Sequence, residues 1–217
     1  MDRNHRSEGR KGEIIDACES LCRTRGYHDI TLRDIGNETP FSRPTIYNYF
    51  RTKEEIFLAL FAREYDRWNL SLERLLADQG PMSAEKFADS IAKTLRSRSL
   101  LLRLLSMNLY DMEAGSRVEN LTAFKASYGA SIRLIRSLLV KFRPEMSDDD
   151  RERFVWAFFP FLFGVHPYTA VTEKQRVAMA NAGVDFPRLS PEALVSSFIR
   201  SALGHRTAAN GGVSNQP

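Results

Sequence analysis

Residues 42–55 read SRPTIYNYFRTKEE and decide how the N-terminal part of the chain folds. Ser42 is a favoured residue for a helix N-cap, and Pro44 follows in the first turn, where a missing amide costs no helical hydrogen bond. Because Pro44 has no amide to offer, we expect the Ser42 hydroxyl to accept a hydrogen bond from the amide of Thr45. The segment therefore predicts a helix that begins after Ser42.

Helical spacing gives this short helix one anchored face and one exposed face. Ile46 and Phe50 are four residues apart and are predicted to point inward together. The side chains that point away from this pair are those of Pro44, Thr45, Tyr47 and Asn48. A helix of barely two turns is unstable alone, so a neighbouring element must hold it.

The neighbouring element is predicted directly upstream, where TLRD begins at Thr31. In this capping pattern the Thr31 hydroxyl accepts from the amide of Asp34, and the Asp34 carboxylate returns the bond. It predicts a short helix over residues 31–38, followed by a turn at residues 39–41. Two short helices with a tight turn and a polar second helix form the helix-turn-helix layout, whose second helix enters the DNA major groove.

The residue types on the exposed face suit a polyanion that carries readable edges. Asparagine, here Asn48, can pair with adenine, and a threonine methyl can contact the thymine methyl. Hydroxyl groups suit phosphates, and Lys53 adds positive charge at the next helix start, where free amides favour an anion. The predicted DNA-binding residues are Thr31, Ser42, Arg43, Pro44, Thr45, Tyr47, Asn48, Tyr49 and Lys53.

The rest of the chain is predicted to be helical, because its apolar residues recur at intervals of three and four. A first helix is predicted over residues 12–25, where Gly26 ends it. TKEE predicts a cap at Thr52, with Glu55 returning the bond, for a fourth helix that reaches about residue 76. Further helices are predicted near residues 84–97, 99–112, 117–142, 148–165, 173–181 and 191–203.

The composition limits the class of protein. Of 217 residues, 43% are hydrophobic and 27% charged, which is typical of a globular chain of one or two domains. The net charge of +4 permits a polyanionic partner without requiring one. The two cysteines form no disulfide framework and the polar N-terminus has no apolar signal core, so we expect a cytoplasmic protein.

Three patterns have both a functional and a structural interpretation. Residues 154–172 contain no formal charge and approach membrane-spanning length, but two prolines and a histidine interrupt them, so a buried or subunit-interface helix is preferred and no membrane partner is expected. Cys18 and Cys22 are interpreted as core residues, and the aspartates at 148–150 as a helix start. No residues complete a ligand set, so neither a metal nor a cofactor is expected.

Residues 14–60 resemble the DNA-binding head of the tetracycline-repressor (TetR) family. IIDACESLCRTRGYHDITLRDIG is similar to its first helix, Gly-Tyr stop and threonine-capped second helix, and FSRPTIYNYFRTKEEIFLAL to its recognition helix and the start of its fourth helix. The match is specific because several spaced features agree. One departure is the turn, where the family usually has Ala-Gly-Val and this chain has Thr39, Pro40 and Phe41.

The resemblance implies a homodimeric transcription regulator, most often a repressor, that binds a palindromic operator in double-stranded DNA and responds to a ligand. We expect a DNA-binding domain at 1–53, a ligand-binding and dimerisation domain at 54–204, and a disordered tail at 205–217. The basic arm at 1–11 is expected either to reach the minor groove or to be a solvated tail.

Two further sets of residues are predicted in the C-terminal domain. The late helices carry excess apolar surface and are expected to join two subunits through Phe158, Leu162, Leu194, Phe198 and Ile199. A small apolar or aromatic ligand is expected beside Met107, Tyr110 and Tyr128.

Two other classes of protein stay open at this stage. A helical protein-interaction adaptor would explain the C-terminal helices, but not the chemistry of the helix-turn-helix segment. An all-helical enzyme with scattered catalytic carboxylates is the other alternative. The sequence shows no glycine-rich phosphate loop, nucleophile elbow or metal quartet, so we do not expect an enzyme.

Overall fold

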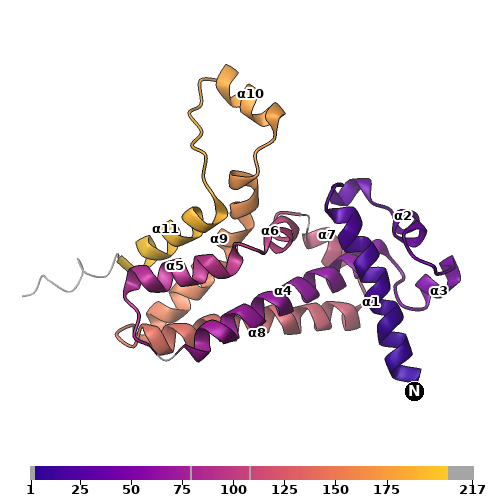
Figure 1. Ribbon diagram of the computed structural model, residues 1–217, viewed down its shortest axis with the longest axis horizontal. Helices are drawn as coiled ribbons and strands as arrows, with labels where there is room; N and C mark the ends of the chain where they lie inside the picture. Colours follow the sequence, from indigo (N-terminus) through magenta and orange to yellow (C-terminus); the bar gives the residue numbers. More distant parts are fainter. Residues whose placement is uncertain (1–2, 79, 108, 205–217) are drawn as a thin grey trace, which may run out of the picture.

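A computed structural model describes residues 3–78, 80–107 and 109–204, and over these residues the chain is helical without strands (Figure 1). This confirms the predicted all-α class. The predicted tail at 205–217 lies outside the described residues. The elements are α1 (Arg3–Cys22), η1 (Tyr27–Asp29), α2 (Leu32–Asn37), α3 (Arg43–Tyr47), α4 (Lys53–Ala77), α5 (Ala84–Leu95), α6 (Ser99–Leu105), α7 (Leu109–Ala114), α8 (Val118–Phe142), α9 (Asp148–Thr169), α10 (Glu173–Asn181) and α11 (Pro191–Gly204).

Helices α1 to α3 form a head at one end of the molecule, and α4 to α11 form the body (Figure 1). Each helix of the head contributes to an apolar core that is continuous with the core of the body. The fully buried side chains in it include Ile14, Cys18, Ile35, Ile46 and Phe50. A short α3 that is unstable alone is therefore held by packing, as the sequence predicts.

Helices α4 and α8 run side by side through the length of the body (Figure 1). Aromatic rings fill the space between them: Tyr65 contacts Phe61 at 5.1 Å and Tyr128 at 5.5 Å between ring centroids. A polar bridge adds specificity, because Ser131 of α8 donates to the side-chain oxygen of Asn69 on α4 at 2.6 Å. Together, α4 and α8 connect the head to the far end of the body.

Helix α11 packs against α5 and α9 at that far end, while α10 projects away from the body (Figure 1). In the part of the chain that the structure describes, no single helix is long and apolar enough to cross a membrane. The one pair that meets the length and composition criteria together is Asp148–Thr169 with Glu173–Asn181, and it is bent by 85°.

Two predicted boundaries are wrong. Helix α1 begins at Arg3, so the described part of the predicted arm is helical; no apolar residue precedes Ile14 in this stretch, so apolar periodicity could not reveal it. The helix predicted over 99–112 is two helices, α6 and α7. Between them the Ser106 hydroxyl and the Met107 amide bond back to nearby carbonyl groups, which closes α6 with a tight turn.

Candidate nucleic-acid interface

Helix α2 begins with the predicted capping box. The amide of Asp34 donates to the Thr31 hydroxyl at 3.2 Å, and the amide of Thr31 donates to the Asp34 carboxylate at 2.8 Å. These bonds from the Thr31 hydroxyl and amide, with a further one from Arg25, hold the pKa of Asp34 at about 2. The box fixes where α2 starts, and so sets the position of the turn that leads to α3.

The turn between the two helices contains no non-glycine residue with positive φ. The Thr39 hydroxyl donates to the carbonyl of Gly36 at 3.0 Å and accepts from the amide of Phe41 at 3.4 Å. Pro40 is accommodated because the Thr39 side chain supplies the bonds that stabilise the turn. The departure from the family's usual Ala-Gly-Val therefore has a local structural explanation.

The hydrogen-bond partner predicted for Ser42 at the N-cap of α3, the amide of Thr45, is wrong. The Ser42 hydroxyl lies 2.9 Å from the hydroxyl of Thr45 and makes no bond to a backbone amide. The two hydroxyl groups satisfy each other, which leaves Ser42 at the N-cap but without the amide bond that the sequence predicts. Pro44 does stand in the first turn.

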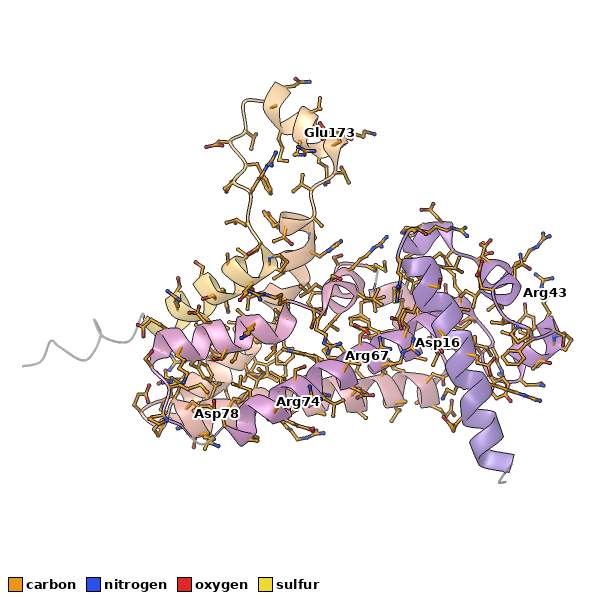
Figure 2. The ribbon with its side chains drawn as sticks, viewed as in Figure 1. Asp16, Arg43, Arg67, Arg74, Asp78 and Glu173 are labelled. Carbon is orange, nitrogen blue, oxygen red and sulfur yellow. The ribbon has the colours of Figure 1, made fainter. Side chains whose placement is uncertain are left out.

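The two faces of α3 are those that the spacing predicts. Ile46 and Phe50 are 1% and 0% exposed, while Arg43, Pro44 and Asn48 are exposed and Tyr47 is 49% exposed. Thr45 and Tyr49 are half-buried. Arg43 lies at the end of the head, pointing away from the body (Figure 2). This face offers cationic, hydroxyl and amide groups on a helix held from behind.

Lys53 has partners within the head. Its ammonium donates to the carbonyl groups of Tyr27 and Ile30, both at 3.1 Å, and lies 4.1 Å from the centre of the Tyr27 ring. Two of the three donors of a lysine ammonium are therefore used inside the protein. Its phosphate contact stays a prediction, and the structure adds a second role, which is to hold η1 against the start of α4.

Two arginines were not singled out from the sequence. Arg33 on α2 and Arg51 after α3 are exposed. Within residues 3–78, 80–107 and 109–204, neither guanidinium makes a hydrogen bond or ion pair. Cationic groups without protein partners beside a polar helix are suited to phosphate contacts. Both arginines stand in motifs that the sequence displays, Arg33 in TLRD and Arg51 in FRTK.

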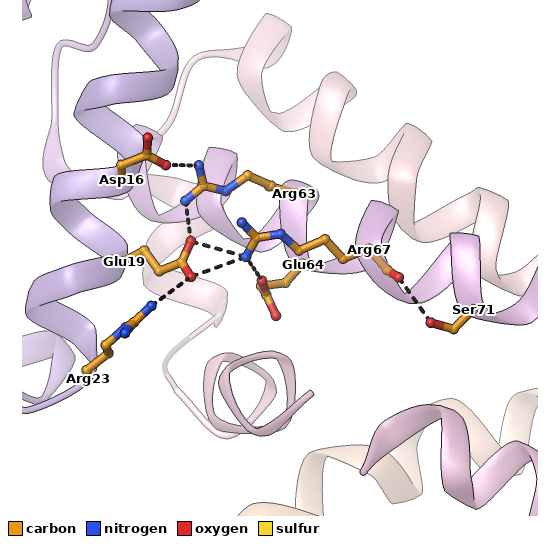
Figure 3. Close-up of polar contacts among 7 residues, drawn as sticks. All are labelled: Asp16, Glu19, Arg23, Arg63, Glu64, Arg67 and Ser71. Atoms are coloured by element: carbon orange, nitrogen blue, oxygen red, sulfur yellow. Dashed lines mark hydrogen bonds and ion pairs between the residues drawn. The ribbon is translucent and has the colours of Figure 1, made fainter. Parts of the chain in front are cut away.

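A network of ion pairs joins α1 of the head to α4 (Figure 3). Arg63 of α4 donates to Asp16 at 2.5 Å and to Glu19 at 2.6 Å, and both acids lie on α1. Arg67 of α4 contacts Glu19 at 3.1 Å and the nearly buried Glu64 at 2.5 Å. Because Glu19 of α1 is shared by both arginines of α4, the angle between α1 and α4 is fixed by several bonds at once.

A second junction forms where the head meets α6 and the turn between α7 and α8. Arg103 of α6 donates to the carbonyl groups of Cys22, the last residue of α1, and of Arg25, which follows the helix. The Thr52 hydroxyl donates to the carbonyl of Gly115 at 3.0 Å and accepts from the amide of Glu55 at 3.3 Å. These bonds give the body a direct mechanical link to the helix-turn-helix segment.

The predicted return bond of Glu55 to Thr52 is not formed. The Glu55 carboxylate accepts from the amide of Arg51 at 2.7 Å instead, and from Arg117. A stronger, charged partner has taken the carboxylate away from the cap. Cys18 and Cys22 are both buried, and among the described residues no group of three or more His, Cys, Asp or Glu could hold a metal ion.

The three predicted ligand residues do not come together. Met107 lines a hollow of about 470 Å³ between head and body, whose wall also includes Tyr27, Arg103 and His166. The ring of Tyr128 lies between Tyr65 and Phe159 in the body. Tyr110 is 80% exposed on α7 and does not line the hollow beside Met107. Its contact with a ligand stays a prediction.

The predicted interface residues separate into two groups. Phe158, Leu162 and Ile199 are fully buried within the single chain, so their prediction as an intersubunit surface is wrong. Leu194 and Phe198 are half-buried, and the Phe198 ring stacks on Phe161 with centroids 4.0 Å apart.

The outer face of α9 carries other apolar residues. Trp156 is 56% and Phe163 is 36% exposed. Apolar residues occur on every face of α9. The spacing of apolar residues in the sequence therefore could not distinguish the inner face of this helix from its outer face.

Both parts of the chain match family models. Residues 14–60 match the model described as "Bacterial regulatory proteins, tetR family", and residues 62–202 match "Tetracyclin repressor-like, C-terminal domain". The second match alone covers more than half of the chain.

Similar proteins of known sequence or structure agree with these matches. The chain is 27% identical over 88 residues to the uncharacterized HTH-type transcriptional regulator YfiR of Bacillus subtilis, over 40% of this chain and 43% of that protein. It is 32% identical over 57 residues to the HTH-type transcriptional activator FasR of Mycolicibacterium smegmatis, over 26% of each. The chain therefore spans less than half the length of these curated relatives.

The crystal structure of the MbdR regulator from Azoarcus sp. CIB has the same fold. It superimposes with a TM-score of 0.52 at 20% identity, over 93% of this chain and 98% of that chain. At this identity the likeness concerns the arrangement of helices alone.

Proposed function

The chain belongs to the tetracycline-repressor (TetR) family of DNA-binding transcriptional regulators, and from this premise we propose that it is a ligand-responsive repressor that binds a palindromic operator as a homodimer. A regulator of genes acts where the DNA is, so the proposal places it in the cytoplasm. It also implies that the chain is not an enzyme.

The observation that carries the proposal is the exposed face of α3. Arg43, Tyr47 and Asn48 project from a helix whose opposite side is anchored by the buried Ile46 and Phe50. Asn48 is the residue with both a donor and an acceptor for the major-groove edge of adenine. Arg43 and the hydroxyl groups position the helix on phosphates, and Lys53, Arg33 and Arg51 supply further charge.

The proposed functions are divided between the two ends of the sequence. We assign DNA binding to residues 1–53, and ligand binding and dimerisation to residues 54–204. Helix α4 belongs to both, because its N-terminal part packs on the head and the rest packs on α8. A ligand that shifts α4 or α6 would move the head through the bonds of Arg63 and Arg103.

The proposed ligand is a small apolar or aromatic molecule. The best-supported place for it is near Met107, because the hollow that this residue lines has walls from both head and body. Tyr128 lies deeper, among the rings between α4 and α8, and would be reached if those rings move apart. Filling either place would push on elements that position α1 to α3.

The proposed homodimer rests on the outer surface of the late helices. Trp156 and Phe163 on α9 are exposed, and Leu194 and Phe198 on α11 are half-buried. Apolar side chains of this size at a surface favour an isologous interface. Two heads on one dimer would read the two halves of a palindrome.

The experiment that tests the proposal separates sequence reading from general attraction to DNA. Duplexes bound by the wild type are first selected from random DNA, and then titrated beside scrambled duplexes. Asn48→Ala should lose about 1–3 kcal/mol of binding free energy on the selected duplex and little on the scrambled one. Asn181→Ala, an exposed asparagine on α10, is the matched control and should bind both duplexes like the wild type.

The rival functions give other results. Equal losses on both duplexes for Asn48→Ala would remove its reading role. A wild type that binds no duplex would favour a helical protein-interaction adaptor, or an all-helical enzyme, over a regulator. The repressor part is tested with a reporter gene behind the selected operator, where expression of the protein should lower transcription; a rise would make it an activator.

A further inference from the structure

The segment between α9 and α11 stands out from the body as an arm, defined here as residues 170–190 (Figure 1). Glu173, at the start of α10, lies near its far end (Figure 2). A capping box between Thr172 and Gln175 orders the helix start, but α10 has nine residues and none is buried. A helix of this length is marginal in water on its own, so the arm calls for a second surface to pack against.

The base of the arm encloses a hollow of about 510 Å³. Its apolar wall joins the end of α9 to both sides of the arm, through Tyr168, Met179, Val184, Phe186 and Leu189. The rings of Tyr168 and Phe186 stack with centroids 6.1 Å apart, which stabilises its shape. Tyr168 is 59% and Val184 is 52% exposed, so the hollow offers apolar surface to an occupant from outside.

The outer face of α9 supplies that occupant when two copies pair. Trp156, Pro160, Phe163 and Pro167 are all exposed and follow one another at intervals of four, three and four, so they form one helix face. A two-fold interface sets the same patch of each copy against itself. The midpoint of this face lies between Pro160 and Phe163, so antiparallel packing about it places Trp156 of one copy opposite Pro167 of the other.

Pro167 directly precedes Tyr168, where the wall of the hollow begins. We infer that each arm clasps the other copy of the chain, with Trp156 of the partner subunit seated in the hollow at the base of the arm. Trp156 is available for this role, because the residue is 56% exposed and, among the described residues, its indole nitrogen donates only to Glu152 on its own helix, at 3.2 Å. The inference rests on the proposed homodimer and deepens it by naming the contact.

The charges agree with this pairing. Asp149 in the first turn of α9 and Arg188 on the arm are exposed, whereas Asp148 pairs with Arg151 of its own helix at 2.7 Å. Antiparallel packing brings the N-terminal end of one α9 toward the C-terminal end of the other, where the arm begins. Opposite charges would then face each other at the edge of the clasp, which favours this orientation of the two copies.

The test is a cross-link between two different variants. Trp156→Cys and Val184→Cys are purified separately, mixed, and oxidised, and disulfide dimers are counted on a non-reducing gel. The mixture should cross-link and each variant alone should not, because antiparallel packing separates the two copies of residue 156 by on the order of 16 Å along α9. Cys18 and Cys22 are buried in the head and do not interfere. Lys174→Cys, exposed on the arm but outside the hollow, is the matched control.

A second measurement needs no added cysteine. Trp156→Ala should raise the dimer dissociation constant roughly tenfold or more, as truncation of a buried aromatic anchor does. Because Trp156 is exposed in the single chain, the substitution should leave the subunit folded, and circular dichroism of the variant checks its helix content. Val140→Ala on α8, 55% exposed in the same chain, should leave the dissociation constant unchanged.

The outcomes separate the clasp from the dimer. A wild type that sediments as a monomer at micromolar concentration overturns both. If Phe163→Cys cross-links with itself but Trp156→Cys does not cross-link with Val184→Cys, the homodimer stands and the clasp is overturned. Equal cross-linking of Trp156→Cys to Lys174→Cys and to Val184→Cys also overturns the seat of Trp156 in the hollow.

Discussion

Arg117, at the N-cap of α8, forms a two-pronged ion pair with Glu55 of α4: Nε lies 2.6 Å from Oε1, and Nη2 lies 2.9 Å from Oε2. Glu55 is 1% exposed. The same guanidinium donates to the carbonyl of Tyr49 at 3.2 Å, just beyond the end of α3. One arginine of the body therefore holds both the start of α4 and the end of the proposed recognition segment.

The first prediction concerns pH. Burial raises the pKa of Glu55, but the bonds from the Arg117 side chain and from the amides of Arg51 and Arg117 outweigh it and hold this pKa at about 2. Because this is below the ordinary value of 4.5, ionised Glu55 contributes stability above pH 4.5 that is lost as the pH falls toward 2. The stability difference between wild type and Glu55→Gln should therefore shrink across that window, as urea titrations at a series of pH values would measure.

The control for this prediction is Glu173→Gln, because the Glu173 side chain is 72% exposed on α10. Its difference from the wild type should be small at every pH, since exposed ion pairs contribute little. A constant difference for Glu55→Gln from neutral pH down to pH 2 would show that the pair with Arg117 does not depend on the charge of Glu55.

The second prediction compares two partners of one arginine. Arg63 contacts Glu19, which is 17% exposed, and Asp16, which is 67% exposed. A double-mutant cycle between Arg63 and Glu19 should give a coupling free energy of about 0.5–3 kcal/mol, because the pair is shielded and shared with Arg67. The cycle between Arg63 and Asp16 should give about 0–1 kcal/mol. Equal couplings in denaturant titrations would mean that the network in Figure 3 is not shielded from solvent.

The third prediction concerns Gly115, between α7 and α8. A Cβ there would lie 2.8 Å from Cγ of Glu54 and 3.2 Å from the carbonyl oxygen of Asp111. Glu54 cannot yield freely, because its carboxylate accepts from the Tyr27 hydroxyl at 2.9 Å. Gly115→Ala should therefore destabilise the protein by about 1–3 kcal/mol through overpacking, measured by urea titration.

Gly12→Ala provides the matched control for Gly115→Ala. A Cβ at Gly12 meets nothing within 4 Å, and the residue lies inside α1. Alanine is favoured over glycine within a helix by roughly 0.5–1 kcal/mol, so this variant should be slightly more stable than the wild type. A neutral Gly115→Ala beside a stabilised Gly12→Ala would show that the turn between α7 and α8 adjusts without strain.

Local signals in the sequence predict the head well. The capping box at Thr31, the buried pair of Ile46 and Phe50, and the cap of α4 at Thr52 are all set by residues within four positions of one another. Such short-range contacts follow from helix geometry alone. The pair of Arg117 with Glu55 lies beyond this range, because the partners are 62 residues apart and their meeting depends on how α4 and α8 pack.

The body shows the limit of periodicity more clearly. On α9 the apolar residues Phe158 and Leu162 face inward, whereas Trp156 and Phe163 face outward, although all four are large and hydrophobic. Nothing in the spacing distinguishes the two faces, because both are apolar. Which one is covered depends on α6, α8 and α11, so the exposed apolar residues of α9 could be identified only from the folded chain.

The fourth prediction concerns Tyr47, which is 49% exposed on α3. Its hydroxyl can bond to a phosphate but carries no charge. Tyr47→Phe should therefore weaken binding to selected and scrambled duplexes alike. The dependence of binding on salt should not change, because a neutral group releases no counterion. Titrations at several salt concentrations measure both quantities, and a loss confined to the selected duplex would give Tyr47 a reading role instead.

The last prediction decides between two roles of Lys53, which binds the carbonyl groups of Tyr27 and Ile30 and is also predicted to contact a phosphate. Lys53→Ala removes both. If the phosphate contact exists, the slope of log K against log salt falls by about one unit per subunit, hence about two in a dimer, on selected and scrambled duplexes alike. The lost carbonyl bonds lower the thermal midpoint of the protein in either case. We expect both changes, because the ammonium has a third donor that the carbonyl groups leave unused. A lower thermal midpoint with an unchanged salt slope would leave Lys53 with the holding role alone.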